Sequence, residues 1–177
     1  IDAVEQVIVR IIQRHEALRT VFAEHSQGPV QIIREDFDFG LQRFDLSGLA
    51  EEEKQNQLQA MINEESCKPF DLTADVMIRA SYVHLGSQAA EPQGILLFNM
   101  HHIAADGWSL GILVDEFMEL YQSLTAKADS TPAPLTIQYG DYAHWQAEYL
   151  DGEALSPQLG YWAEQLKGAP VIHALPL

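Results

Sequence analysis

The chain has 177 residues and is 47% apolar, which is enough for one domain with a core and too apolar for a disordered chain. Its 26 acidic and 10 basic residues give a net charge of −16, and this charge argues against general binding to nucleic acid or to anionic membranes. A single cysteine, Cys67, excludes a disulfide framework and a cysteine-rich zinc site.

No segment has the pattern of a membrane span or a signal peptide. The longest uncharged apolar run, Gly94 to Met100, is far shorter than the ~20 residues that cross a bilayer. The start of the chain, Ile1 to Glu5, carries acids where a signal peptide carries basic residues. We therefore expect a cytoplasmic protein. Because a helical pattern is already running at the first residues and no Met precedes it, we also expect a piece of a longer chain.

The first part of the chain predicts a helix, a hairpin, a short strand and a second helix. Residues 1–15 repeat apolar side chains at spacings of three and four, which indicates an amphipathic helix. Short β-branched and aromatic runs at 20–22 and 30–33 flank a Gly-Pro turn and predict a hairpin. A strand is expected at 41–44, and residues 49–66 predict a polar surface helix with a thin buried stripe.

The second part predicts two strands and then helices. Residues 76–85 alternate, which is typical of a strand with two unlike faces, and a loop is expected at 86–93. The apolar run 95–100 is typical of a strand covered on both faces. Three helices are predicted after it: 110–124, then 138–150 and 156–167 with aromatic anchors. This order predicts an α/β (α+β) fold, a mixed β-sheet with helices packed on it.

The stretch from His101 to Gly107 is the best candidate for chemistry. It lies where a predicted strand ends and a helix starts, so that a rigid strand aims a side chain into an open loop. Strand alternation would point His101 and His102 to opposite faces, and the other histidines lack metal-ligand spacing, so we expect no metal site. An imidazole titrates near neutral pH and is a natural general base. Asp106 is equally well interpreted as an ordinary helix N-cap, with Gly107 serving the turn.

Three stretches together resemble one known family. His101-His102, three residues and Asp106-Gly107, followed by Trp108-Ser109, resemble the HHxxxDG core motif of condensation domains of nonribosomal peptide synthetases. Residues 14–22, RHEALRTVF, are similar to the RHExLRTxF motif of that family, and residues 139–145, YGDYAHW, to its YxDYAxW motif. Three motifs in the right order make the resemblance specific.

The resemblance implies a fold and its extent. Condensation domains belong with the chloramphenicol acetyltransferase-like acyltransferases and have two similar lobes around a tunnel. The first motif and first strand of the family would precede Ile1, and its second lobe would follow Leu177. We expect residues 1–177 to be most of the N-terminal lobe, lacking the first strand and the whole C-terminal lobe, and to be inactive in isolation.

The resemblance also implies a reaction and its partners. Condensation domains join a donor thioester to the amine of an acceptor, forming an amide (peptide) bond. Both substrates are carried on the 4′-phosphopantetheine of carrier domains, and no cofactor is bound directly. The expected partners are the donor and acceptor carrier (thiolation) domains, adjacent synthetase domains and the missing C-terminal lobe, with no nucleic acid and no membrane.

The motif positions imply residue roles. His102 is the catalytic histidine, and both deprotonation of the amine and its positioning by a hydrogen bond stay open. Asp106 is implied to be structural and to pair with an arginine, for which Arg19 is the candidate in this chain. Gly107 would let the backbone approach the substrate because it lacks a Cβ, and His101 would pack or form a hydrogen bond.

Other motif residues have plainer expected roles. Tyr139, Asp141 and Trp145 are expected to support the site by packing. Arg14 and His15 are interpreted either as motif residues or as the solvated end of the first helix.

Several alternatives are weighed against this interpretation. Heterocyclization domains carry aspartates where this chain has His101 and His102, and epimerization domains usually follow the heptad by Ser-Trp rather than by Trp108-Ser109. The Trp-Ser order favours condensation, and together with the RHExLRT match it resembles the type that takes an L-configured donor. Two further functions stay open: a related HHxxxDG acyltransferase that uses acyl-CoA or an alcohol acceptor, and a non-catalytic module that docks carrier domains.

Overall fold

The computed structural model describes residues 1–26, 28–88, 91–126, 132–170 and 172. The chain divides into two units, residues 1–138 and 139–177, and each is considered by itself. Among the described residues, no helix is both long enough and apolar enough to cross a membrane.

The predicted first helix is confirmed as α1 (Asp2–Arg14). Its apolar stripe is fully buried and consists of Val7, Ile8, Ile11 and Ile12. Burying such side chains contributes about 1.5–3 kcal/mol each, so this stripe is a large part of the core of the first unit. A 3-10 turn, η1 (Glu16–Arg19), leads to the predicted hairpin, in which β1 (Thr20–His25) pairs antiparallel with β2 (Gly28–Ile33).

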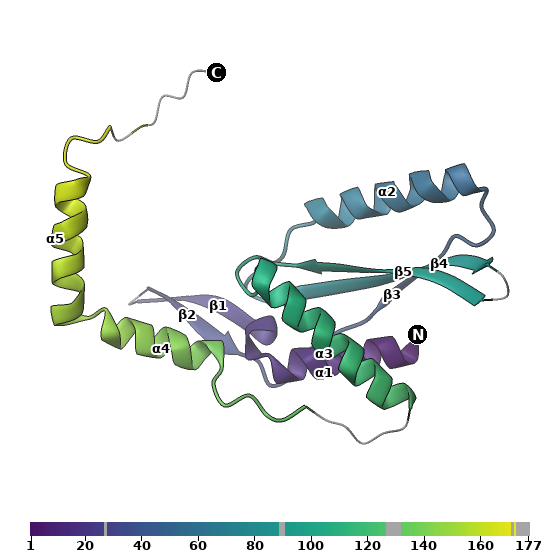
Figure 1. The fold of residues 1–177 in the computed structure, drawn as a ribbon, viewed down its shortest axis with the longest axis horizontal. Coiled ribbons are helices and arrows are strands. Elements are labelled where there is room, and N and C mark those ends of the chain that lie inside the picture. The colour runs from purple at the N-terminus through teal and green to yellow at the C-terminus, as the bar shows by residue number, and fades with distance from the viewer. Residues whose placement is uncertain (27, 89–90, 127–131, 171, 173–177) are drawn as a thin grey trace. The chain divides into compact units, whose positions relative to one another are not determined.

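The predicted mixed sheet has three strands. β3 (Gln42–Asp45) runs parallel to the central strand β4 (Ile78–Gln88), and β5 (Glu91–Met100) runs antiparallel to it. Helices cover both faces: α1 and α3 (Gly107–Thr125) lie on one face and α2 (Glu51–Cys67) on the other (Figure 1).

The alternation along the strands assigns side chains to these two faces. Ile78 and Ala80 of β4, with Leu96 and Phe98 of β5, pack into the cluster formed by α1 and α3. The intervening residues face α2, which has no fully buried residue, so its predicted buried stripe is only half-buried at Leu58, Met61 and Ile62.

The predicted loop at 86–93 is wrong. β4 continues to Gln88 and β5 begins at Glu91, with Ser87 opposite Pro92, after a register irregularity near Gly86, where φ is +110°. Polar residues can extend a strand pair because the backbone supplies the ladder of hydrogen bonds. The run 95–100 is only half-buried, since β5 is an edge strand of this sheet and receives cover from its faces but not from a neighbour on one side.

The second unit contains the two predicted C-terminal helices, α4 (Tyr139–Tyr149) and α5 (Leu155–Gln165), with η2 (Gly152–Ala154) between them. Their aromatic side chains are not buried anchors: Trp145 and Trp162 are 54% and 57% exposed. Along α4 they contact one another instead, because spacings of three and four residues bring neighbouring rings together. Gly168, with a φ of +80°, lies in the turn that follows α5, as the sequence predicts.

Candidate active site

The turn between β5 and α3 is built around His101. The backbone N–H of His101 donates to the carbonyl of Met77 at 3.1 Å, which ties the end of β5 to the start of the neighbouring strand segment. The N–H of Ala104 donates to the carbonyl of His101 at 3.0 Å, and the N–H of Ile103 donates to its Nδ1 at 3.1 Å. Because Nδ1 accepts a hydrogen bond, a neutral His101 carries its proton on Nε2. His101 therefore holds the shape of the turn through its backbone and its Nδ1.

The two adjacent histidines have different surroundings. His101 is half-buried and its ring meets the ring of Phe70 edge to face, with 5.7 Å between ring centroids. His102 is exposed at the surface of the turn. No group of three or more metal-ligating side chains gathers anywhere in the described ranges. His102 is therefore the more accessible of the two imidazoles in this turn.

Asp106 caps α3. Its carboxylate accepts hydrogen bonds from the backbone N–H and the hydroxyl of Ser109, at 2.8 and 2.7 Å, and the N–H of Asp106 donates to the hydroxyl oxygen of Ser109 at 3.3 Å. These bonds from Ser109 stabilise the carboxylate and lower the pKa of Asp106, and His102 adds a smaller attraction. The turn that presents His102 is thus closed at its far end by a capping box.

We expect Asp106→Ala to lower the urea concentration at the midpoint of unfolding, because the cap of α3 is lost. Asp106→Asn should retain most of this stability, since an amide oxygen also accepts from Ser109. Urea unfolding of the two variants measures the difference. The lowered pKa means that the carboxylate contributes fully above its ordinary pKa of 3.8 and loses this contribution as the pH falls through the lowered value. Equal stability of Asp106→Ala and wild type at pH 7 would contradict the role of the cap.

Glu116 of α3 joins this turn to the end of α1. Its two carboxylate oxygens accept from Arg14 Nε at 3.0 Å and interact with His15 Nε2 at 2.6 Å. The side chains of Arg14, His15 and Glu116 are only 17%, 25% and 14% exposed, so the interpretation of Arg14 and His15 as a solvated helix end is wrong. Burial raises the pKa of Glu116, but the bonds from His15 and Arg14 outweigh it and the pKa is lowered.

Glu116 was not predicted from the sequence. Its only sequence signal is an acid on the predicted helix that follows a motif, and this signal does not tell which basic residue it meets. A second contact near the same helix end comes from Gln138, whose amide donates to the carbonyl of Arg14 at 2.9 Å and accepts from the N–H of Glu16 at 3.2 Å.

A small pocket of about 140 Å³ lies between the two motif regions. Residues of the first motif line one part of it, including His15 and Leu18. Ala104 and Ser109, from the turn and the start of α3, line another part. Two stretches more than eighty residues apart in the sequence therefore meet behind the turn that carries His102.

The whole chain matches one known protein family. The family model described as "Condensation domain" matches residues 1–177.

The chain belongs to the condensation-domain family.

Individual proteins and solved structures are also similar to this chain. One of the linear gramicidin synthase proteins of Brevibacillus parabrevis is 44% identical over 176 residues, which cover 99% of this chain and 3% of that protein. Malpinin synthetase of Mortierella alpina is 38% identical over 175 residues, with 98% and 2% covered. The crystal structure of the X-domain from teicoplanin biosynthesis matches with a TM-score of 0.83 at 27% identity, over 99% of this chain and 37% of that chain. The chain thus spans a few per cent of these curated relatives and little more than a third of that solved chain.

The pairing of Arg19 with Asp106, expected from the resemblance to condensation domains, is not formed. Arg19 donates from Nη1 to the carbonyl of Arg34 at 2.9 Å and forms an ion pair with Glu16 at 3.4 Å. The carboxylate of Asp106 is already satisfied by Ser109, three residues away. Arg19 therefore pairs with Glu16 and Asp106 bonds to Ser109, each three residues away in the sequence. Arg19 lies just before the β1–β2 hairpin and not at the turn.

The remaining motif residues are Gly107 in the first unit and Tyr139, Asp141 and Trp145 in the second. Gly107 begins α3, and a Cβ at this position would meet no heavy atom within 4 Å, so the backbone here is open to an approaching molecule. Tyr139, Asp141 and Trp145 lie on α4 of the second unit, where Tyr139 and Trp145 are 55% and 54% exposed. Their support of the site stays a prediction.

Proposed function

We propose that residues 1–177 are most of the N-terminal lobe of a condensation domain that forms an amide bond between a donor thioester and the amine of an acceptor. The observation that carries the proposal is the exposed His102 at the end of β5, in an HHxxxDG turn whose ends are held by His101 and Asp106. Both substrates would arrive on the 4′-phosphopantetheine arms of donor and acceptor carrier domains, with adjacent synthetase domains as further partners.

The proposed reaction needs a group that takes the proton of the acceptor amine or positions this amine for attack. The acceptor nitrogen forms a bond to the thioester carbonyl carbon, the carbon–sulfur bond breaks, and the thiol leaves with the electron pair and a proton. His102 would take the proton that the nitrogen loses, or would hold the amine in line for attack. An imidazole suits either role near neutral pH, and its exposure in the open turn leaves it accessible to an amine.

The surface of α3 supports a lobe that is completed by a second lobe. Only one side of α3 packs on the sheet and α1, through Leu113 and Leu120. Yet large apolar side chains are also exposed elsewhere on the helix and at the turn: Ile103, Trp108, Leu110, Ile112, Val114 and Met118. Exposed apolar patches of this kind mark interaction surfaces. We therefore propose that residues 1–177 in isolation are catalytically silent.

The test uses the complete protein that contains this chain, with two loaded carrier domains. Amide formation is followed by intact-protein mass spectrometry as a mass transfer from the donor carrier to the acceptor carrier. We expect transfer from the carrier-bound donor and none from the same acyl group on CoA. Transfer from acyl-CoA alone, or to an alcohol acceptor, would favour the related acyltransferase. Carrier binding without any transfer, with several donors tried, would favour a docking module.

A further inference from the structure

The basic residues of this acidic chain gather in one pocket of the first unit. The chain has 10 lysines and arginines against 26 acids, and four of the ten line a single pocket of about 380 Å³: Arg19, Arg34, Lys68 and Arg79. Two carboxylates share this lining, those of Asp38 and Asp75. The side chains that line the pocket therefore carry more positive than negative charge, while Glu16 and Glu65, outside the lining, pair with Arg19 and Lys68.

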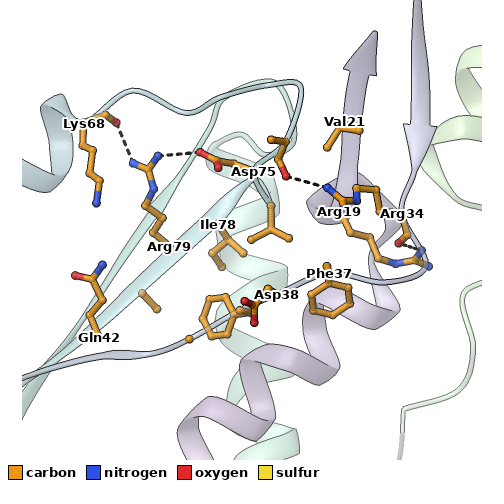
Figure 2. A pocket seen from close by; sticks show the side chains of 15 residues that line it. Arg19, Val21, Arg34, Phe37, Asp38, Gln42, Lys68, Asp75, Ile78 and Arg79 are labelled. Atoms are coloured by element: carbon orange, nitrogen blue, oxygen red, sulfur yellow. Dashed lines mark hydrogen bonds and ion pairs between the residues drawn. The ribbon is translucent and has the colours of Figure 1, made fainter.

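The pocket is formed where three segments meet. Arg19 and Arg34 come from the start and the end of the hairpin, Lys68 follows α2, and Arg79 lies near the start of β4. Figure 2 shows Lys68 and Gln42 on one side of the view and Arg19 and Arg34 on the other. His101 and His102 are not among the residues that line this pocket, so it is distinct from the candidate active site.

Backbone carbonyls hold two of the guanidinium groups in place. Arg79 donates to the carbonyls of Lys68 and Pro69, at 3.0 and 2.6 Å, and lies 3.8 Å from the centroid of the Phe70 ring. Arg34 donates from Nη1 to the carbonyl of Ala74 at 3.3 Å (Figure 2). Carbonyls orient these groups without neutralising their charge. The pocket is thus built before any ligand arrives, and this reduces the entropic cost of binding.

Part of the donor capacity of the pocket is unused. The Nε of Arg19 is buried and has no hydrogen-bond partner among the described residues. The ammonium group of Lys68 lies 3.9 Å from the carboxylate of Glu65, beyond a hydrogen bond, and its side chain is 49% exposed. Asp75, in contrast, is already engaged by Arg79 at 3.3 Å and by the N–H of Asp71 at 3.0 Å. Of the two carboxylates in the lining, Asp75 therefore already has a guanidinium and a backbone N–H as partners.

Apolar side chains make up another part of the lining. Val21, Phe37, Phe39, Val76 and Ile78 lie beside the basic groups. A volume of about 380 Å³ falls in the range of small-molecule sites rather than of a site for a bare inorganic ion. Basic groups next to an apolar wall suit a ligand with an anionic head and a short apolar body.

We propose that this pocket binds a small organic anion, a phosphate or carboxylate group on an apolar body. Arg34 would contact the anionic head, Lys68 on the opposite side of the pocket would attract it through its charge, and the apolar wall would contact the body. Charge-assisted hydrogen bonds from guanidinium and ammonium groups are the strong interactions in such a site.

The test uses the intact protein and three probes with the same ring: phenyl phosphate, benzoate and benzyl alcohol. Saturation-transfer NMR measures binding of each. We expect saturable binding of at least one of the two anions and none of the alcohol, and the anion that binds more tightly identifies the head group. Absence of saturable binding of both anions, or equal binding of the alcohol, would overturn the proposal.

Substitutions of lining residues test whether the anion binds in this pocket. The double variant Arg34→Gln, Lys68→Gln should weaken anion binding tenfold or more, while Lys167→Gln, an exposed lysine of the second unit, should leave it unchanged. Asp38→Asn should tighten binding, since it removes a negative charge from the lining. His102→Ala should leave binding unchanged, which separates this site from the proposed amide-forming activity. Unaltered binding in the double variant or a weaker Asp38→Asn variant would contradict the assignment.

Discussion

Replacing His102 by Ala should lower the rate of the proposed amide formation between two loaded carrier domains by about 10²-fold or more. This loss is expected because His102 is the exposed imidazole of the turn, and general base or positioning groups of this kind contribute on that scale. Mass transfer to the acceptor carrier, measured in single-turnover experiments, gives the rate.

A matched control removes another exposed imidazole. His25→Ala, at the end of β1, should leave the rate unchanged. The variant His102→Asn separates the two roles, since an amide can hold an amine by a hydrogen bond but is a poor base. Partial activity in His102→Asn would favour positioning, and activity as low as in His102→Ala would favour base action. An undiminished rate in His102→Ala would remove His102 from the reaction.

Replacing Glu116 by Ala should destabilise the protein by about 1–3 kcal/mol, because Arg14 and His15 would both lose the partner of their half-buried polar groups. Glu116→Gln should lose less, since its amide oxygen still accepts from one of them. Denaturant unfolding at pH 7 measures the change in the free energy of unfolding. Glu119→Gln, which alters an exposed acid on the same helix, serves as the control.

The pH dependence of this contact has a definite sign. Since the pKa of Glu116 in the folded state lies below its ordinary value of 4.5, the carboxylate contributes fully above that value. Its contribution is lost as the pH falls through the lowered pKa. The difference in stability between wild type and Glu116→Gln should therefore shrink on acidification. A difference that is constant from pH 7 to pH 3, or absent at pH 7, would contradict the ionic contact.

Much of this first unit follows from local patterns in the sequence. The stripe of α1 was predictable because its apolar side chains repeat with the period of a helix, and the hairpin because a Gly-Pro turn separates two β-branched runs. The interpretation of Asp106 as an N-cap is confirmed, since an N-cap bond spans only three residues. The motif around His101 and His102 was also readable, because its members lie within seven consecutive positions.

Contacts between distant segments were decided only by the tertiary structure. The bond from Arg14 to Glu116 joins residues 102 positions apart, and the pocket of Arg34 and Lys68 brings the hairpin next to the end of α2. The extension of β4 and β5 through polar residues depended on backbone pairing, which side-chain patterns do not reveal. The sequence by itself thus determined the elements and the turn that presents His102, because hydrophobic periodicity and capping act within a few residues. The packing of the helices on the sheet determined which charged residues form ion pairs. Ion pairs form only between groups that this packing brings close together.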